Sequence, residues 1–275
     1  APSPMNRIDT TFSTLAAQGR KALVGFLTAG DPDHDTSLAI LRQACAAGLD
    51  VVELGVPFSD PTADGPVIQR ASQRALKTGA SLSRTIALAA ELRRAADTPI
   101  VLFSYYNPIF KYGLARTAEE AAAAGVDGML VVDLPPEEAG PLAAALGPFG
   151  IHLIRLAAPT TTPERLLKLA AGAGGFLYLI TRLGVTGTGG LDFEAVKRHA
   201  AEVRAAVPLP VCLGFGISSG EDAATLAPLA DGIVVGSALV SLVERHAATP
   251  AALPAIVAAK VRELRAGTDR GSSRS

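Results

Sequence analysis

Residues 22–54 read ALVGFLTAGDPDHDTSLAILRQACAAGLDVVEL, and the pattern of this stretch recurs along the rest of the chain. A short apolar run at 22–27 is followed by an amphipathic segment at 35–47 and by a second apolar run at 51–54. Runs that are apolar at consecutive positions are typical of parallel strands covered on both faces, whereas the middle segment has helical spacing. The stretch therefore predicts one strand–helix–strand unit.

The same alternation continues to the end of the chain. Eight short apolar runs are expected to form strands, at residues 22–27, 51–54, 100–105, 128–132, 152–156, 176–180, 211–214 and 232–235. Helical patterns separate them, and a further helix is expected at 7–19. Eight strands alternating with helices in about 250 residues is the size and order of a TIM barrel. We therefore predict an α/β fold, a (β/α)8 TIM barrel with extra helices including an N-terminal one.

A doubly wound open sheet is the competing architecture. Such sheets often carry a Gly-x-Gly-x-x-Gly turn after the first strand. The first expected strand is followed by TAGDP at 28–32 instead, which favours the barrel. No linker or low-complexity block divides the chain, so we predict a single domain at 7–265, an N-terminal extension at 1–6 and a disordered tail at 266–275.

Composition excludes several classes of function. The chain has 275 residues, of which 49% are hydrophobic and 19% charged, and its formal net charge is −1. A broad surface for nucleic acid or anionic membranes needs a basic excess, which is missing here. No apolar run reaches the ~20 residues of a membrane helix, and the first residues lack a signal-peptide pattern. We expect a cytoplasmic protein.

The cysteines and histidines form no metal-binding pattern. Cys45 and Cys212 lie far apart in apolar stretches, and the four histidines show no His-x-x-x-His spacing. Disulfide scaffolds are usually small and rich in cysteine. We predict two free thiols and no metal site.

Carboxylates follow the second expected strand. In such barrels the active site lies at the carboxyl ends of the strands. Glu53 lies inside the second strand, and Asp60 and Asp64 follow in a loop with three prolines. Burial raises the pKa of a carboxyl group toward the range in which it can donate and retake a proton. A structural glutamate bound by backbone donors and a proline-rich turn capped by aspartates are the simpler interpretations, and both stay open.

Glycines follow the last three expected strands. They are Gly184, Gly187 and Gly190 after the sixth, Gly214 and Gly216 after the seventh, and Gly236, which precedes Ser237, after the eighth. Glycine lets backbone N–H groups approach a phosphate, and barrels often bind phosphate at the loops after strands 7 and 8. Three such segments together favour a phosphate site over tight turns alone.

Two further strand ends carry polar or aromatic groups. Tyr105 and Tyr106 close the third strand and could wall an apolar ligand, whereas Asn107 is expected in a turn. Asp133 follows the fourth strand, where it either caps the next helix or points into the barrel mouth. Together these patterns predict a barrel enzyme with a carboxylate acid/base and a small phosphorylated substrate, and they do not give the reaction.

The same segments carry a specific resemblance. The 17-residue block ELGVPFSDPTADGPVIQ at 53–69 resembles the signature of the tryptophan synthase alpha chain family. The similarity continues in order through YYNP at 105–108, DLP at 133–135, GVTG at 184–187, GFGI at 214–217 and VGS at 235–237. It spans roughly residues 5–265.

The resemblance implies a lyase of tryptophan biosynthesis that cleaves indole-3-glycerol phosphate to indole and glyceraldehyde 3-phosphate by retro-aldol chemistry. It assigns Glu53 as the acid/base, Asp64 as the group that stabilises the indole N–H, and Tyr178 as a supporting tyrosine. The residues implied for the phosphate are Gly187, Gly216, Gly236 and Ser237. Those implied for the indole pocket are Phe26, Tyr105 and Phe215.

The resemblance also implies a partner, the tryptophan synthase beta chain, in an α2β2 heterotetramer. Pyridoxal phosphate would belong to that beta chain, so no cofactor is expected in this chain. The residues implied for partner-facing and closure loops are Pro57, Asp60, Asn107, Arg182 and Thr186.

Alternative functions stay open at this point. A stand-alone indole-3-glycerol-phosphate lyase would use the same residues without a beta chain. Another phosphate-binding barrel enzyme would typically use a lysine or an aspartate pair at its strand ends, and no expected strand core carries lysine. A non-catalytic subunit of the same fold would have lost Glu53 and Asp64, which are both present.

Overall fold

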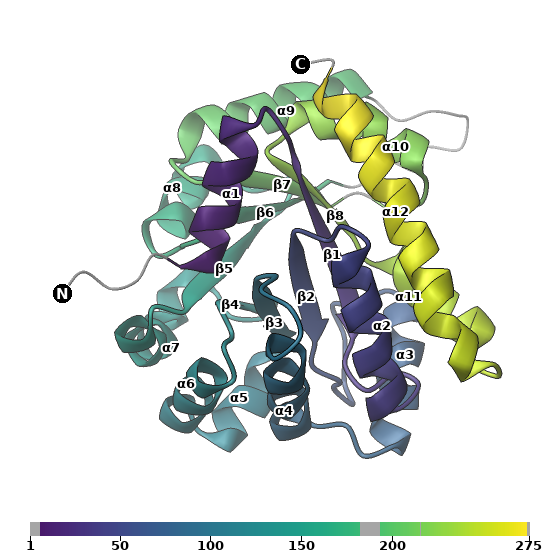
Figure 1. Cartoon of the computed structure of the whole chain (residues 1–275). Coiled ribbons are helices and arrows are strands. Elements are labelled where there is room, and N and C mark those ends of the chain that lie inside the picture. The colour runs from purple at the N-terminus through teal and green to yellow at the C-terminus, as the bar shows by residue number, and fades with distance from the viewer. Residues whose placement is uncertain (1–5, 182–192, 215, 274–275) are drawn as a thin grey trace.

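The predicted barrel is confirmed by the computed structural model, which describes residues 6–181, 193–214 and 216–273. Eight parallel strands close into a barrel in chain order, with β1 paired to β8 (Figure 1). The strands are β1 (Ala22–Thr28), β2 (Val51–Gly55), β3 (Ile100–Ser104), β4 (Gly128–Val131), β5 (His152–Ala157), β6 (Leu177–Ile180), β7 (Val211–Gly214) and β8 (Gly232–Val235). The predicted strand ends differ from these by one residue at most.

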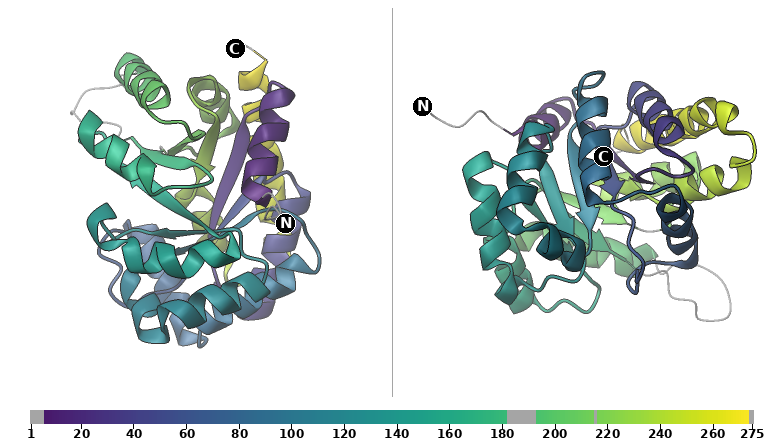
Figure 2. Two further views of the ribbon diagram at one scale, coloured as in Figure 1. Left: turned by 90° about the vertical axis from the view of Figure 1, so that its left-hand side faces the viewer. Right: turned by 90° about the horizontal axis from the view of Figure 1, so that it is seen from below.

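Helices cover the outside of the barrel (Figure 2). They are α1 (Arg7–Ala17), α2 (His34–Ala46), α3 (Pro66–Lys77), α4 (Leu82–Arg93), α5 (Tyr106–Tyr112), α6 (Leu114–Ala123), α7 (Gly140–Leu146), α8 (Pro163–Ala171), α9 (Phe193–Ala206), α10 (Gly220–Leu226), α11 (Ser237–His246) and α12 (Leu253–Ser272). Short 3₁₀ turns lie at Pro136–Glu138, Gly147–Phe149, Ala227–Leu229 and Pro250–Ala252. Leucine, isoleucine, valine and alanine side chains fill the layer between strands and helices.

Helix α1 covers the N-terminal end of the barrel. Its buried residues Ile8, Phe12 and Leu15 pack into the same cluster as the inward-facing residues of the strands. Asn6, predicted to belong to the extension, is part of this covering layer. Its side chain accepts the Ile8 N–H at 2.8 Å and donates to the Asp127 carbonyl at 2.8 Å. The folded domain therefore begins at least one residue earlier than predicted.

Three aspartates fix the register at the N-terminal end of the barrel. Asp50, Asp127 and Asp231 directly precede β2, β4 and β8. Each accepts a backbone N–H from the first residues of the neighbouring strand, β1, β3 and β7 respectively, at 2.8 to 2.9 Å. Each also pairs with an arginine, in the pairs Asp50–Arg265, Asp127–Arg93 and Asp231–Arg204. These bonds satisfy strand N–H groups that the ladder leaves unpaired at its start.

The predicted disordered tail is wrong for residues 266–272, because α12 continues to Ser272. Thr268 is fully buried, and Gly267 and Gly271 are buried as well. An added Cβ on Gly267 would lie 2.0 Å from the Gly220 carbonyl oxygen of α10. The missing side chains therefore let the two helices touch. The small residues of this segment suggested a disordered end because the helix that they pack against, α10, is distant in the sequence.

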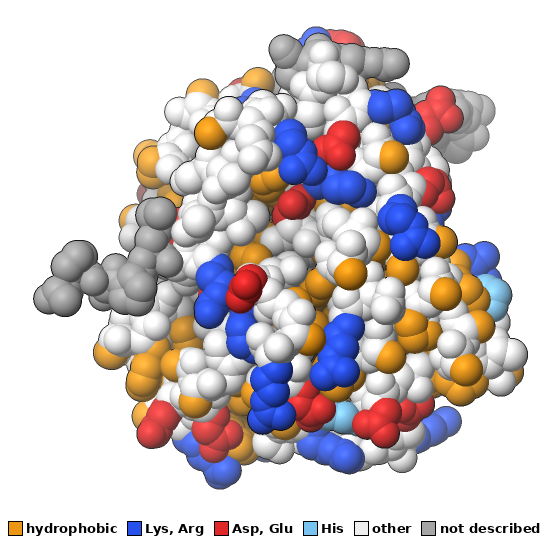
Figure 3. Space-filling view, viewed as in Figure 1, with side chains coloured by type: hydrophobic (Ala, Val, Ile, Leu, Met, Phe, Trp, Pro, Cys, Tyr) orange, Lys and Arg blue, Asp and Glu red, His pale blue; other side chains and the backbone are white. Residues whose placement is uncertain are grey.

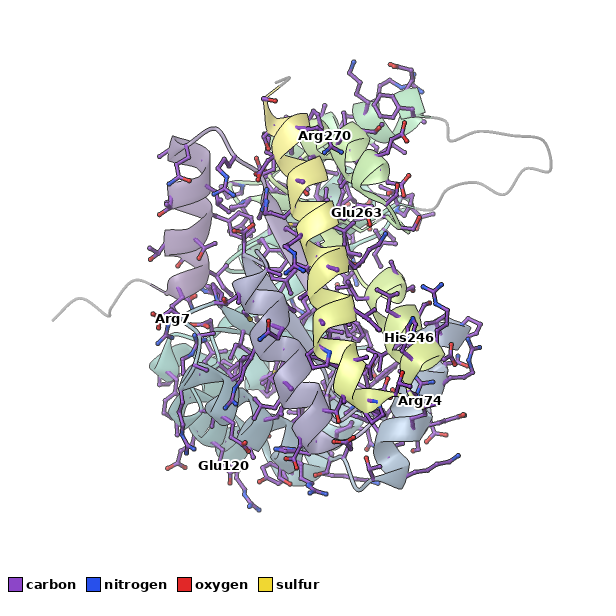
Figure 4. The ribbon with its side chains drawn as sticks, turned by 45° about the vertical axis from the view of Figure 1, so that its right-hand side comes forward. Arg7, Arg74, Glu120, His246, Glu263 and Arg270 are labelled. Atoms are coloured by element: carbon purple, nitrogen blue, oxygen red, sulfur yellow. The ribbon has the colours of Figure 1, made fainter. Side chains whose placement is uncertain are left out.

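Helix α12 is also fixed to α10 by polar contacts. Glu263 and Arg270, labelled in Figure 4, lie on α12. The Gly220 N–H donates to Glu263 Oε1 at 2.9 Å, and Arg270 Nη2 donates to the Gly220 carbonyl at 3.5 Å. A helix that makes these contacts belongs to the packed domain.

On the face shown in Figure 3, basic and acidic side chains are interspersed. Within the described ranges, none of the helices is both long and apolar enough to cross a bilayer.

The close contact between α10 and α12 gives a stability prediction. Replacing a helical glycine by alanine normally stabilises a helix by about 1 kcal/mol. We expect Gly267→Ala to destabilise the protein by about 2 kcal/mol instead, because the new methyl group would overlap backbone. Urea unfolding measures the difference. The control is Gly140→Ala on α7, where an added Cβ meets nothing within 4 Å. A Gly267→Ala variant as stable as the control would contradict the close contact.

Candidate active site

A cavity of about 530 Å³ opens at the carboxyl ends of the strands. Residues of β1, β2, β3, β6, β7 and β8 line it, together with the start of α3 and the segments that follow β6, β7 and β8. Of the residues predicted for the site, those in the lining are Phe26, Glu53, Tyr178, Gly216, Gly236 and Ser237. The barrel thus brings the predicted acid/base, one aromatic wall and part of the predicted phosphate cradle to one place.

Glu53 is the central residue of β2 and lies in register with Phe26 on one side and Val101 on the other. Its side chain is 1% exposed, and Oε1 has no hydrogen-bond partner among the described residues. Burial raises the pKa of this carboxyl to about 8. Glu53 is therefore mostly protonated at neutral pH. A purely structural glutamate would require donors, and Oε1 has none in the described part of the chain.

Tyr178 on β6 is seated against β7. An added Cβ on Gly214 would lie 2.3 Å from the Tyr178 hydroxyl oxygen, so the ring occupies the space that this glycine leaves free. Burial raises the pKa of Tyr178, and the charge of Glu53 raises it further. The phenol therefore stays protonated and can act only as a neutral hydrogen-bonding group near Glu53.

Two phenylalanines form an aromatic wall. Phe26 and Phe103 meet edge to face, with ring centroids 5.1 Å apart. A Cβ on Gly55 would lie 2.5 Å from Phe26 Cζ, so Gly55 makes room for this ring as Gly214 does for Tyr178. Phe103 is not among the site residues predicted from the sequence. Period-two alternation along β3 from Val101, the neighbour of Glu53, could have found it.

The segments after β7 and β8 offer an anion-binding surface. Gly216 has a φ of 64°, which favours glycine, and Gly236 precedes the first residue of α11, Ser237. No side chain caps the N-terminus of α11 in the described structure, so its first backbone N–H groups are open to a ligand. None of the described lining residues is lysine or arginine. An anion bound here would be held by backbone groups and the Ser237 hydroxyl.

Asp64 and Tyr105 lie outside the lining of this cavity. The Ala63 N–H donates to the Tyr105 hydroxyl at 2.9 Å, and that hydroxyl also hydrogen-bonds to the Asp64 carboxyl. The Tyr105 ring contacts Phe58, with centroids 5.1 Å apart. Burial raises the pKa of Asp64, and the Tyr105 bond opposes that rise. In this structure Tyr105 holds the loop after β2 that carries Asp64.

The residues predicted for the loops are dispersed. Pro57 is buried, whereas Asp60 is exposed and accepts the Ser59 hydroxyl at 2.8 Å. Asn107 is exposed on α5. The predicted site residues Arg182, Thr186, Gly187 and Phe215 lie outside the described residues.

Asp133 caps a helix, but a different one from the helix expected. Its Oδ1 accepts the Tyr106 N–H at 2.7 Å, at the start of α5. That helix follows β3, whereas Asp133 follows β4. The cap therefore ties two neighbouring strand ends together.

An ion-pair network that was not predicted from the sequence supports the cavity from outside. Asp31, which is buried after β1, accepts two hydrogen bonds from Arg74 of α3, at 2.9 and 2.8 Å. Arg74 also pairs with Glu244 of α11 at 3.0 Å, and Figure 4 labels it. The network fixes the loop after β1 and the helices that flank the cavity. Its members are far apart in the sequence, so no local motif shows it.

The described residues contain no cluster of three or more histidine, cysteine, aspartate or glutamate side chains that could hold a metal ion. Both cysteines are free, Cys212 buried and Cys45 partly buried.

Comparisons with known proteins agree on one family. The family model described as tryptophan synthase alpha chain matches residues 12–269. The chain is 52% identical over 264 residues to the tryptophan synthase alpha chain of Desulfosudis oleivorans, covering 96% of this chain and 99% of that one. It is 47% identical over 266 residues to that of Nitrosococcus oceani, covering 96% and 98%.

Solved structures give the same result. The crystal structure of tryptophan synthase subunit alpha from Legionella pneumophila matches with a TM-score of 0.90 at 36% identity, covering 97% of this chain and 99% of that chain. The barrel, the buried glutamate at its mouth and these similarities lead to one conclusion: the chain belongs to the tryptophan synthase alpha chain family.

Proposed function

We propose that this chain cleaves indole-3-glycerol phosphate to indole and glyceraldehyde 3-phosphate, as the alpha subunit of tryptophan synthase. Membership of this lyase family supports the proposal. The observation that carries it is Glu53, a buried carboxyl whose pKa is raised to about 8. It lies in a cavity that also reaches the open N-terminus of α11. The substrate has one group for each of these features. Glu53 would protonate its indole ring, and the N-terminus of α11 would bind its phosphate.

The reaction balances with a single acid/base. The protonated Glu53 gives its proton to C3 of the indole ring, and the ring nitrogen takes up positive charge. The bond between C3 and the adjacent side-chain carbon then breaks, and its electrons restore the ring. The hydroxyl on that carbon becomes an aldehyde as the Glu53 carboxylate removes its proton. Glu53 thus ends in the protonation state in which it began, which a pKa near the working pH favours.

The other site residues bind and orient the substrate for this proton transfer. We assign Asp64 to the indole N–H, where its carboxylate would stabilise the positive charge. The neutral Tyr178 hydroxyl would hydrogen-bond within the site, and Phe26 would contact the ring. The phosphate would be bound by the backbone at Gly216 and Gly236 and by the first turn of α11.

We also propose that the beta chain of tryptophan synthase binds near the barrel mouth, in an α2β2 assembly, and that this partner carries the pyridoxal phosphate. An exposed aromatic residue on α5 supports the location. Phe110 is 64% exposed, and its ring packs on Tyr106 at 5.8 Å between centroids. Asn107, one of the residues assigned to the partner surface, lies on the same helix. Aromatic residues are enriched at protein–protein interfaces.

Substitutions at the two carboxylates test the reaction. We expect Glu53→Gln to lower the rate of indole release by at least about 100-fold, because an amide cannot transfer the proton. Asp64→Asn should retain traces of activity, because an amide oxygen can still accept the N–H. An indole-release assay on indole-3-glycerol phosphate measures both. The control is Glu119→Gln at an exposed position of α6. Normal turnover by Glu53→Gln would contradict the acid/base role assigned to Glu53.

The raised pKa of Glu53 predicts a pH-dependent stability. The folded protein keeps a proton on Glu53 up to about pH 8, whereas the unfolded chain loses it near the ordinary glutamate pKa of 4.5. The wild type should therefore lose stability as pH rises through this window. Glutamine does not ionise, so Glu53→Gln should gain roughly 3 kcal/mol relative to wild type between pH 5 and pH 8. Urea unfolding at both values measures this, and a constant difference would contradict the raised pKa.

The beta chain separates the proposed subunit from a stand-alone lyase. We expect purified beta chain to bind this chain and to raise its rate of indole release, because partner contact can close loops over the substrate. The assay is run with and without beta chain, and light scattering measures the mass of the complex. Full activity alone, with no complex formed, would favour the stand-alone enzyme and leave the cleavage reaction itself intact.

A further inference from the structure

Arg155 is a buried guanidinium that lacks a carboxylate partner. It lies on β5 and is 5% exposed. Its Nη1 donates to the Leu134 carbonyl at 3.2 Å, and its buried Nε has no hydrogen-bond partner among the described residues. None of the described carboxylate oxygens lies within 4.0 Å of an Arg155 nitrogen, the limit for an ion pair. Arginine keeps its proton when buried, so this charge persists inside the protein.

The other buried arginine shows how the fold normally treats such a charge. Arg265 pairs with Asp50 and Asp269, and it also donates to the Lys21 carbonyl at 2.9 Å. An unpaired buried charge costs several kcal/mol, and partners offset that cost. Among the described arginine and lysine side chains, Arg155 alone is buried without a carboxylate in ion-pair contact. Its hydrogen bond goes to a neutral carbonyl, so none of its donors meets a charged acceptor among the described residues.

A pocket of about 340 Å³ adjoins Arg155, between the ends of β4, β5 and β6 and the start of α8. We call it the rim pocket. Its wall carries two other charged residues, and both are engaged elsewhere: Arg165 pairs with Glu137, and Asp133 accepts the Tyr106 N–H. The rest is mostly apolar, including Val132, Leu156, Ala157, Leu169 and Ile180. Of the two arginines in this wall, Arg155 is the one without an ion pair, and the carboxylate that acts on it electrostatically, Glu137, lies beyond ion-pair distance.

We propose that the rim pocket is a second ligand site, which binds a small carboxylate with an apolar body and pairs it with Arg155. A planar carboxylate matches the guanidinium fork, and it would supply the direct ion pair that Arg155 lacks among the described residues. The apolar wall would contact the hydrocarbon part of the ligand. A phosphate dianion fits less well, because Asp133 also lines the pocket.

The rim pocket is separate from the cavity that contains Glu53. Ile180 is the one described residue that lines both. A ligand on Arg155 would therefore lie beside the reaction site without occupying it. This proposal does not depend on the reaction assigned to Glu53.

Calorimetric titration of the full chain with sodium benzoate tests the site. We expect saturable binding to the wild type and at least tenfold weaker binding of benzamide, which has the same shape without the charge. Arg155→Met should weaken benzoate binding at least tenfold. Arg204→Met is the matched control, because Arg204 pairs with Asp231 at the other end of the barrel. It should bind benzoate as the wild type does.

A second variant protects the test against misfolding of Arg155→Met. Ala158→Phe keeps Arg155 and fills the rim pocket from its wall, so it should also lose benzoate. Thermal unfolding confirms that each variant is folded. Unchanged binding in both variants would show that benzoate binds elsewhere. Absence of saturable binding to the wild type would show that Arg155 does not form a benzoate site. Either result overturns the proposal. Inorganic phosphate that binds more tightly than benzoate, and only with Arg155 present, would overturn the carboxylate assignment.

Discussion

The pairing of β1 with β8 is the contact on which the rest of this structure depends. It closes the sheet, so none of the eight described strands has an open edge and their carboxyl ends meet around one opening. Residues as distant as Phe26, Glu53, Tyr178 and Ser237 line one cavity for this reason. Helix α1 and the aspartates before β2, β4 and β8 complete the other end of the barrel, where they affect stability and not the reaction.

The buried groups of the site lower the stability of the folded protein. Glu53 is buried with an unpartnered oxygen, and the resulting rise in its pKa both prepares it for proton transfer and destabilises the protein as pH rises. Two strand glycines make room for aromatic side chains of the same site. Gly55 leaves space for Phe26, and Gly214 leaves space for Tyr178. Gly214 thus has a packing role that the glycine pattern alone, taken as a phosphate signal, did not indicate.

Glu53 and Arg155 illustrate two responses to burial without a partner. A carboxyl group can take up a proton and become neutral, which is what the raised pKa of Glu53 describes. A guanidinium cannot lose its proton at physiological pH, so Arg155 remains charged beside an apolar pocket. The first response suits proton transfer. The second suits the binding of an anion, which is the basis for the ligand site proposed at the barrel rim.

The sequence by itself determined the barrel, its strands to within one residue, and the position of Glu53, because strand patterning and the order of strand ends are local properties. The tertiary structure decided the rest. The helical end of α12 depends on contact with Gly220, and the cap that Asp133 provides depends on a neighbouring strand end. The Asp31–Arg74 pair and the place of Phe103 in the cavity likewise depend on closure. Each of these joins segments distant in sequence, and only packing in three dimensions sets such distances.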